Sequence, residues 1–157
     1  AELLGALREV EAEPKARLLR IEGAGPHFSF GASVREHRAE HAEAMLRAMR
    51  ALLLALYASP VPSLAVVRGF CLGGGLELAL CCSWIAAAED ARFGLPEIAL
   101  GALPAFALAL LPRRIAPAQA EDWMLSGRHL SAREAEAAGL VRVALAPKEL
   151  ESWYSSF

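Results

Sequence analysis

The sequence has few of the features that direct a protein to a membrane or an oxidising compartment. It has three cysteines, Cys71, Cys81 and Cys82, and their spacing forms neither a CxxC pair nor a metal-binding pattern. We expect reduced, buried thiols in a cytoplasmic protein. The longest uninterrupted apolar run, Ala51 to Ala58, is too short to span a bilayer. No basic segment followed by an apolar core opens the sequence, so we expect no secretory leader.

The chain also lacks a charge excess and the common nucleotide-binding and hydrolase motifs. Its 16 basic and 18 acidic residues give a net charge of −2, which favours neither a nucleic-acid partner nor a membrane surface. It has no GxxxxGK[ST] loop and no GxSxG elbow. Gly73-Gly74-Gly75 follows an apolar run, as a dinucleotide-binding turn would, but Leu78 stands where the last glycine of GxGxxG belongs.

Short apolar runs alternate with helical patterns along the chain, with no repeat, linker or low-complexity segment between them. That alternation predicts one α/β domain over residues 1–157. We expect strands at 17–21, 63–67, 84–88 and 140–143. We expect helices at 3–10, about 40–57, 76–82, 103–113 and 117–125, and a further helix starting with a capping box at 131–134.

The chain is organised around the three glycines that separate the strand expected at 63–67 from the apolar helix after Leu76. Glycine lets the backbone come close to a ligand. The first N–H groups of the following helix have no partner within the helix, and they lie at the positive end of its dipole. The turn therefore predicts a site for negative charge.

Two carboxylates, Glu77 and Glu97, lie 20 residues apart, each alone in an apolar run. Glu77, at a helix N-terminus, is favoured as the anion, whereas apolar surroundings favour the protonated form of Glu97. Such a pair can serve as general base and general acid. The alternative is that each glutamate forms a structural ion pair with an arginine, such as Arg92 or Arg113.

These segments carry a family resemblance. The run Gly69 to Ala79 followed by Phe93 to Ile98 resembles the enoyl-CoA hydratase/isomerase (crotonase) superfamily. Phe28 to Val34 occupies the place of that family's first oxyanion loop, and 126–128 and 134–141 match later landmarks. The resemblance implies a crotonase-like spiral of ββα units. It also implies a hydratase that adds water across the double bond of an enoyl-CoA.

The resemblance also implies the roles of individual residues. The backbone N–H groups of Ala32 and Gly74 would bind the thioester oxygen, Glu77 would activate water, and Glu97 would supply a proton. The substrate and CoA would contact Phe30, Ala32, Ser33, Val34, Arg35, Gly73, Gly74 and Phe106. Coenzyme A would be part of the substrate, so no separate cofactor and no metal are expected. The chain would form a homotrimer or a dimer of trimers.

The sequence departs from the family pattern in three respects. Ser33 replaces the usual aspartate, and the segment Ala102 to Leu108 is bulkier and more apolar than the usual glycine-rich loop. Both features resemble those of the family branch that hydrates the alicyclic ring of cyclohexa-1,5-diene-1-carbonyl-CoA. The chain also lacks counterparts of the family's first strand and most of its C-terminal helices.

Three other functions remain open at this point. The protein could be an isomerase of the same fold, or a CoA-binding or assembly subunit without catalysis. His37-Arg38-Ala39-Glu40-His41 also has the HxxEH form of a metal motif. It lies in a strongly charged stretch with no further metal-site pattern, which favours a solvated helix face.

Overall fold

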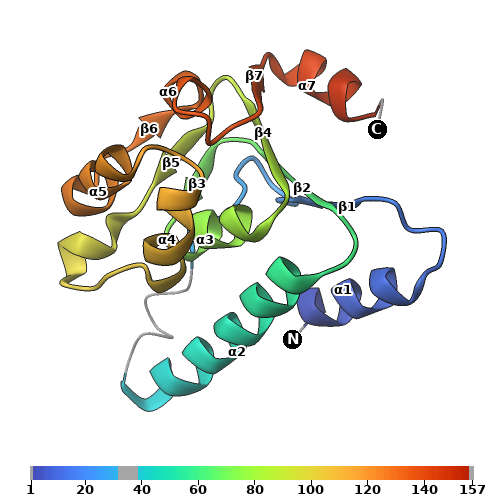
Figure 1. Cartoon of the computed structure of the whole chain (residues 1–157), viewed down its shortest axis with the longest axis horizontal. Helices are drawn as coiled ribbons and strands as arrows, with labels where there is room; N and C mark the ends of the chain where they lie inside the picture. Colours follow the sequence, from blue (N-terminus) through green and yellow to red (C-terminus); the bar gives the residue numbers. More distant parts are fainter. Residues whose placement is uncertain (1, 32–38, 156–157) are drawn as a thin grey trace.

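The computed structural model describes residues 2–31 and 39–155, with side chains in the second helix described from residue 42 onward. In chain order the elements are α1 (Glu2–Ala12), β1 (Leu19–Glu22), α2 (Ala39–Ala58), β2 (Ser63–Val67), β3 (Phe70–Leu72), α3 (Gly74–Cys81), β4 (Trp84–Ala88), β5 (Arg92–Gly94), the 3-10 helix η1 (Pro96–Leu100), α4 (Ala105–Leu110), the 3-10 helix η2 (Leu111–Arg113), α5 (Pro117–Ser126), β6 (Leu130–Ser131), α6 (Ala132–Ala137), β7 (Val143–Leu145) and α7 (Pro147–Tyr154). Figure 1 shows their arrangement.

The strands form two sheets. The first has the order β1-β2-β4-β7 and is parallel throughout. In the second, of order β3-β5-β6, β3 and β5 are parallel and β6 is antiparallel to β5. The chain passes from β2 to β3 and then to α3, and later from β4 to β5 and then to η1. These successive strand–strand–helix units confirm the expected α/β class, and they place the Gly73 turn after β3 and Glu97 after β5.

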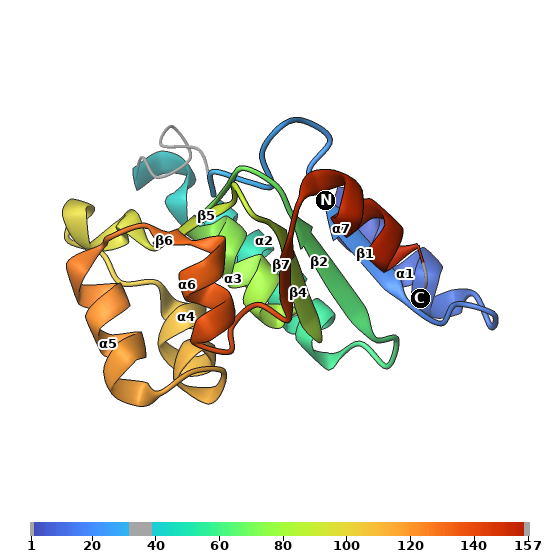
Figure 2. The ribbon, with the colours of Figure 1, turned by 90° about the horizontal axis from the view of Figure 1, so that it is seen from above.

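Side chains from the two faces of the first sheet enter two separate cores, because successive residues of a strand point to opposite faces. Leu64, Val66, Ala86 and Ala88 pack with Leu150 and Tyr154 of α7. Ala65, Val67, Ile85 and Ala87 belong to the larger core, which α1, α2 and α3 also enter. In Figure 2, α7 lies on one side of the first sheet, and α2 and α3 lie on the other.

Several predicted elements are confirmed, among them the strands at 63–67 and 84–88 and the long second helix. The capping box is also present: the Ser131 hydroxyl accepts from Glu134 N–H, and the Glu134 carboxylate accepts from Ser131 N–H. Pro147 begins α7 at its first helical position, where a missing N–H removes no helical hydrogen bond.

Other predictions are wrong in their boundaries. The expected helix at 103–113 begins only after Pro104 and divides into α4 and η2, with Pro112 inside η2. The expected strand at 140–143 starts instead at Val143, because Leu140 and Val141 donate their N–H groups to Ala135 at the end of α6. The three strands of the second sheet were not predicted as strands, since runs of two or three residues are too short to show an alternating pattern.

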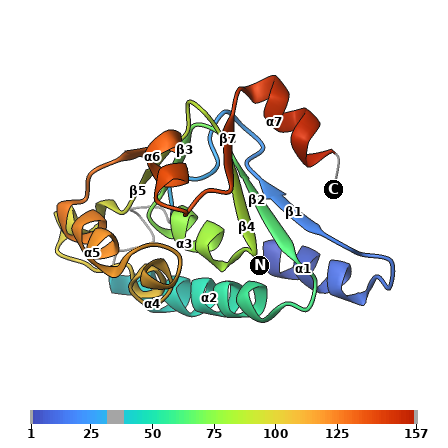
Figure 3. The ribbon, with the colours of Figure 1, turned by 45° about the horizontal axis from the view of Figure 1, so that its top comes forward.

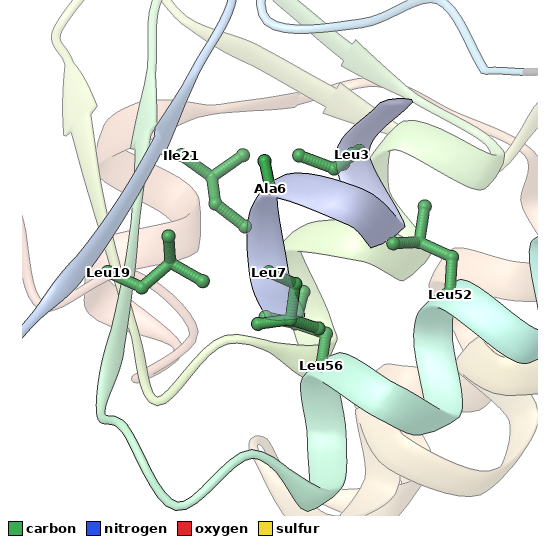
Figure 4. A pocket seen from close by; sticks show the side chains of 7 residues that line it. All are labelled: Leu3, Ala6, Leu7, Leu19, Ile21, Leu52 and Leu56. Atoms are coloured by element: carbon green, nitrogen blue, oxygen red, sulfur yellow. The ribbon is translucent and has the colours of Figure 1, made fainter. Parts of the chain in front are cut away.

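A small cavity of about 20 Å³ lies between α1, β1 and α2. Figure 4 shows its lining, which consists of Leu3, Ala6, Leu7, Leu19, Ile21, Leu52 and Leu56. An apolar space of this size is a packing gap with no group that could orient a ligand. Within the described residues, no helix combines the length and the hydropathy needed to cross a bilayer.

Candidate active site

The glycine turn lies between the end of β3 and the start of α3. Gly73 caps α3 with a φ of 53°, in the left-handed region that favours glycine. Its carbonyl accepts the N–H of Glu77 at 3.0 Å, and its own N–H donates to the Gly94 carbonyl at 2.9 Å. The N–H groups of the first helical turn after Gly73, starting at Gly74, come before the first intrahelical bond and can bind a ligand oxygen.

A second loop approaches this turn at Gly31, which has a φ of 89°. A Cβ atom added to Gly31 would lie 3.1 Å from the Gly74 nitrogen and 3.0 Å from the Leu72 carbonyl oxygen. Only glycine combines this conformation with such a close approach. The predicted contact residues Ala32, Ser33, Val34 and Arg35, which follow Gly31, lie outside the described residues. Their roles stay predictions.

The carboxylate of Glu77 is held by the start of another helix. The Glu77 side chain is 9% exposed, and its Oε1 accepts the N–H groups of Phe106 at 2.7 Å and Ala107 at 3.2 Å. Both donors lie in the first turn of α4, where N–H groups have no helical partner. In the described part of the chain, Glu77 forms no ion pair with arginine, and the Arg92 guanidinium donates to the carbonyls of Asp90 and Ala91.

Glu97 reaches the same glycine turn from the first turn of η1. Its Oε1 lies 2.7 Å from the position that a Cβ atom on Gly73 would occupy. Glu77 is joined to Gly73 through its N–H, and the Glu97 carboxylate lies against the Gly73 α-carbon. Gly73 therefore contacts the carboxylate of Glu97 and the backbone of Glu77, whereas the Glu77 carboxylate is bound at the start of α4.

A groove of about 450 Å³ runs along the turn. Its lining comes from α1, α2, the Gly31 loop and α3: Leu3, Leu4, Ser29, Gly31, Met45, Ala48, Met49, Ala51, Leu52, Gly74, Gly75 and Leu78. Figure 3 shows α2 extending beneath α3, with α1 beside it. Apart from Ser29, the side chains that line the groove are apolar, so it suits a hydrocarbon chain or ring that ends at the Gly74 turn.

The phenylalanines near the site differ in their surroundings. Phe28 is 8% exposed and belongs to the core, whereas Phe30 is 60% exposed and its ring contacts those of His27 and Phe70. Phe106 is half-buried, packs against the larger core and supplies one of the N–H groups that hold Glu77. None of the three lines the groove.

The three cysteines are buried and not joined by disulfides, as expected. Burial raises the pKa of the Cys81 and Cys82 thiols to about 12 and raises that of Cys71 well above its usual value. These thiols therefore stay protonated near neutral pH and are poor nucleophiles. No group of three metal-ligating side chains occurs among the described residues. The His37-to-His41 string falls outside the part of the chain whose side chains are described.

The chain is similar to known proteins over nearly its whole length. The family model for enoyl-CoA hydratase/isomerase matches residues 1–156. The chain belongs to this family. Cyclohexa-1,5-dienecarbonyl-CoA hydratase of Thauera aromatica is 43% identical over 147 residues, which cover 91% of this chain and 57% of the relative. A probable enoyl-CoA hydratase of Bacillus subtilis is 37% identical over 90% of the chain and 57% of its own length.

Solved structures of the enoyl-CoA hydratase/isomerase family show the same fold. An enoyl-CoA hydratase from Bacillus anthracis superposes with a TM-score of 0.94 at 32% identity, covering 99% of this chain and 62% of that structure. An enoyl-CoA hydratase/carnithine racemase from Magnetospirillum magneticum gives a TM-score of 0.91 at 32% identity, covering 99% and 61%. The crotonase-like fold is thereby confirmed. The chain spans about three fifths of the length of the relatives it matches.

Proposed function

We propose that the protein hydrates the α,β double bond of an enoyl-CoA thioester. One observation carries this proposal: the Glu97 carboxylate lies against the Gly73 turn that opens α3, and Glu77 follows in the first turn of α3 with its carboxylate held by the N–H groups of Phe106 and Ala107, while Gly74 and Gly75 of the same turn line an apolar groove. Two acids and an N–H donor for a carbonyl oxygen are the groups that water addition to a conjugated thioester needs.

The proposed reaction assigns one step to each group. The thioester oxygen accepts hydrogen bonds from the N–H groups of Gly74 and Ala32, which stabilise the negative charge that develops on it. Glu77 takes a proton from water as the water oxygen bonds to Cβ, and the double-bond electrons move toward the thioester as an enolate. Glu97 then gives a proton to Cα, and the added hydrogen and hydroxyl sum to one water.

The hydrogen bonds to Glu77 support its role as the base. Two backbone N–H groups on Oε1 fix the orientation of the carboxylate. Because both bonds go to Oε1, the second carboxylate oxygen remains able to accept a proton from water. No separate cofactor is needed in this scheme, since coenzyme A enters with the substrate.

For the acyl group we propose a cyclic dienoyl thioester. The 43% identity to cyclohexa-1,5-dienecarbonyl-CoA hydratase supports this choice. Phe106 stands in place of a small residue of the usual family loop and binds Glu77 through its backbone N–H, and its rigid ring is the proposed restriction on the size of the acyl group near the acids. The groove is large enough for a six-membered ring, and shape exclusion would then disfavour a flexible chain.

We also propose assembly into a homotrimer or a dimer of trimers, in the cytoplasm. Leu103, Leu108 and Leu125 are each at least 44% exposed, so the segment from 103 to 125 presents apolar side chains to solvent. A second copy of the chain is the proposed cover for these side chains. Light scattering at micromolar concentration tests this: a monodisperse monomer would contradict it.

The function is tested with a panel of linear and cyclic enoyl-CoA thioesters. We expect loss of the conjugated thioester absorbance together with a mass gain of one water. A shift of the double bond without mass gain would show the isomerase alternative. Tight binding of the panel with no reaction would show a CoA-binding subunit, and absence of both binding and reaction would contradict the proposal.

A further inference from the structure

Ser29 supplies the single polar side chain among the described residues that line the groove. The other lining residues are leucines, methionines, alanines and glycines. A hydroxyl in an apolar site is costly to bury without a partner, and it fixes the orientation of a bound ligand when it finds one. We therefore expect the Ser29 hydroxyl to contact a polar atom of a bound ligand.

The backbone of Ser29 is held rigidly against β3. Its N–H donates to the Phe70 carbonyl at 3.0 Å, and its carbonyl accepts the Leu72 N–H at 2.9 Å. The two bonds form a short parallel bridge to Cys71. Since both backbone groups are hydrogen-bonded, the place from which the side chain enters the groove is fixed before any ligand binds.

The hydroxyl itself lies between Gly31 and the first turn of α3. Ser29 Oγ accepts the Gly31 N–H at 3.1 Å. On the other side, a Cβ atom added to Gly75 would lie 2.8 Å from Ser29 Oγ and 2.6 Å from its Cβ. The absence of a side chain at Gly75 thus makes room for this serine directly against the first turn of α3.

The hydrogen-bond capacity of the hydroxyl is only partly used. A serine hydroxyl has one proton to donate and two lone pairs. Gly31 uses one lone pair, and among the described residues no acceptor receives the proton. Gly74 and Gly75 line the groove together with Ser29 and begin α3, where N–H groups have no helical partner, so an oxygen bound at this end of the groove would meet donors from α3 as well as the hydroxyl.

We propose that the Ser29 hydroxyl donates a hydrogen bond to the thioester carbonyl oxygen of the substrate, beside the Gly74 N–H. This inference rests on the proposed function and adds a side-chain donor to the two backbone donors of the oxyanion site. The hydroxyl keeps its bond from Gly31 N–H while donating, so no rearrangement is needed on binding.

The experiment compares two probes that differ in the carbonyl oxygen alone. Cyclohexanecarbonyl-CoA is a thioester, and S-cyclohexylmethyl-CoA is the matching thioether, which has a CH₂ group in place of the carbonyl. Titration calorimetry measures the Kd of each for the unmodified chain and for Ser29→Ala. We expect Ser29→Ala to weaken thioester binding about 3- to 10-fold and to leave thioether binding unchanged, since a neutral hydrogen bond has a modest net effect.

The control and the second variant separate contact with the ligand from a role in the loop alone. Ser59 Oγ accepts the Val61 N–H at 3.4 Å in the same i to i+2 arrangement, away from the groove, so Ser59→Ala should change neither affinity. Ser29→Cys keeps the side-chain shape but is a weak donor, and it should show the same selective loss. It also keeps the test valid if Ser29→Ala fails to fold.

Two results would overturn the inference. Equal weakening of both probes would mean that Ser29 only shapes the loop, and no weakening of either would mean that it makes no contact. With the unmodified chain, hydration of enoyl-CoA alongside either of these results would leave the proposed function standing. If the unmodified chain binds neither probe and hydrates no thioester, the proposed function fails and the inference fails with it.

Discussion

The Glu97 side chain occupies the space that a side chain on Gly73 would need. Oε1 of Glu97 lies 2.7 Å from the position of a Cβ atom on Gly73, a distance at which one of the two must move. Because the displaced group is the proposed proton donor, we expect Gly73→Ala to lower kcat/KM by ~100-fold or more, as loss of general-acid catalysis does. Steady-state hydration kinetics measure this.

A matched control separates this collision from backbone strain. Gly101 also has a left-handed conformation, with φ at 67° against 53° for Gly73, but a Cβ atom on Gly101 would meet nothing within 4 Å. Gly101→Ala should therefore cost about 1 kcal/mol of unfolding free energy, and its activity should stay near that of the unmodified chain. Equal activity losses in the two variants would show that strain alone is responsible.

The second prediction concerns the acids themselves. Glu77→Gln and Glu97→Gln should each reduce turnover by ~100-fold or more with little effect on the binding of a saturated acyl-CoA. Glutamine at residue 77 keeps an oxygen for the Phe106 and Ala107 N–H groups, so the fold around it should persist. The exposed Glu121→Gln is the control. Full activity in either of the first two variants would remove the hydratase assignment.

Phe106 provides a test of the substrate class. We expect the unmodified chain to have a higher kcat/KM for a cyclic dienoyl-CoA than for crotonyl-CoA, and Phe106→Gly to shift that ratio toward the linear substrate by about 10-fold or more. Ala109→Gly is the control, because it places a glycine in the same helix at an exposed position that holds no large apolar side chain. Preference of the unmodified chain for crotonyl-CoA would exclude the cyclic substrate but leave hydration in place.

The buried thiols predict how stability depends on pH. Folding raises the pKa of Cys81 and Cys82 from 9.0 to about 12, so between these values the folded chain keeps protons that the unfolded chain has lost. The stability contributed by each thiol is complete below pH 9, and it falls by about 1.4 kcal/mol per pH unit above that.

Replacing one thiol should flatten this dependence. Urea unfolding at pH 8 and pH 10 should show a smaller loss of unfolding free energy for Cys82→Ala than for the unmodified chain, with the difference near 1.4 kcal/mol. Subtracting the loss of unfolding free energy of one protein from that of the other cancels the contributions of the other groups that titrate in this range. Identical pH dependence in both would show that the Cys82 thiol ionises in the folded protein as it does in the unfolded one.

The burial of Glu77 could be predicted from the sequence, because a lone glutamate in an apolar run needs a physical reason for its place there, whereas the catalytic roles of Glu77 and Glu97 stay predictions. Glu77 indeed lies in the core region, and the first turn of α4 supplies its partners. The partners were not predictable, since Phe106 and Ala107 act through backbone N–H groups that any residue except proline offers. Long elements such as α2 were predictable from their periodicity, whereas β3 and β5 depend on pairing with each other.

Neither the groove nor the place of Ser29 in it was predicted. The groove forms where α1 and α2 face α3, and the sequence of each helix shows its apolar faces but not which neighbour they meet. A serine two residues before a glycine is typical of a turn and carries no sign of a binding role. The signal that could have found it is the pairing of a small polar side chain with Gly75, which depends on the approach of distant segments.

Hydrogen bonds join the segment from Pro104 to Arg114 to α3 near both of its ends. At its start, Phe106 and Ala107 bind the Glu77 carboxylate. At its end, the Arg114 guanidinium donates to the carbonyls of Leu80, Cys82 and Ser83, just where α3 finishes. The segment from Pro104 to Arg114 cannot move away from α3 without breaking the hydrogen bonds to the Glu77 carboxylate or those of the Arg114 guanidinium. If the proposed hydration takes place in this groove, we expect the substrate to enter along α1 and α2, and the rate of product release to respond to changes in those helices rather than in the segment from Pro104 to Arg114.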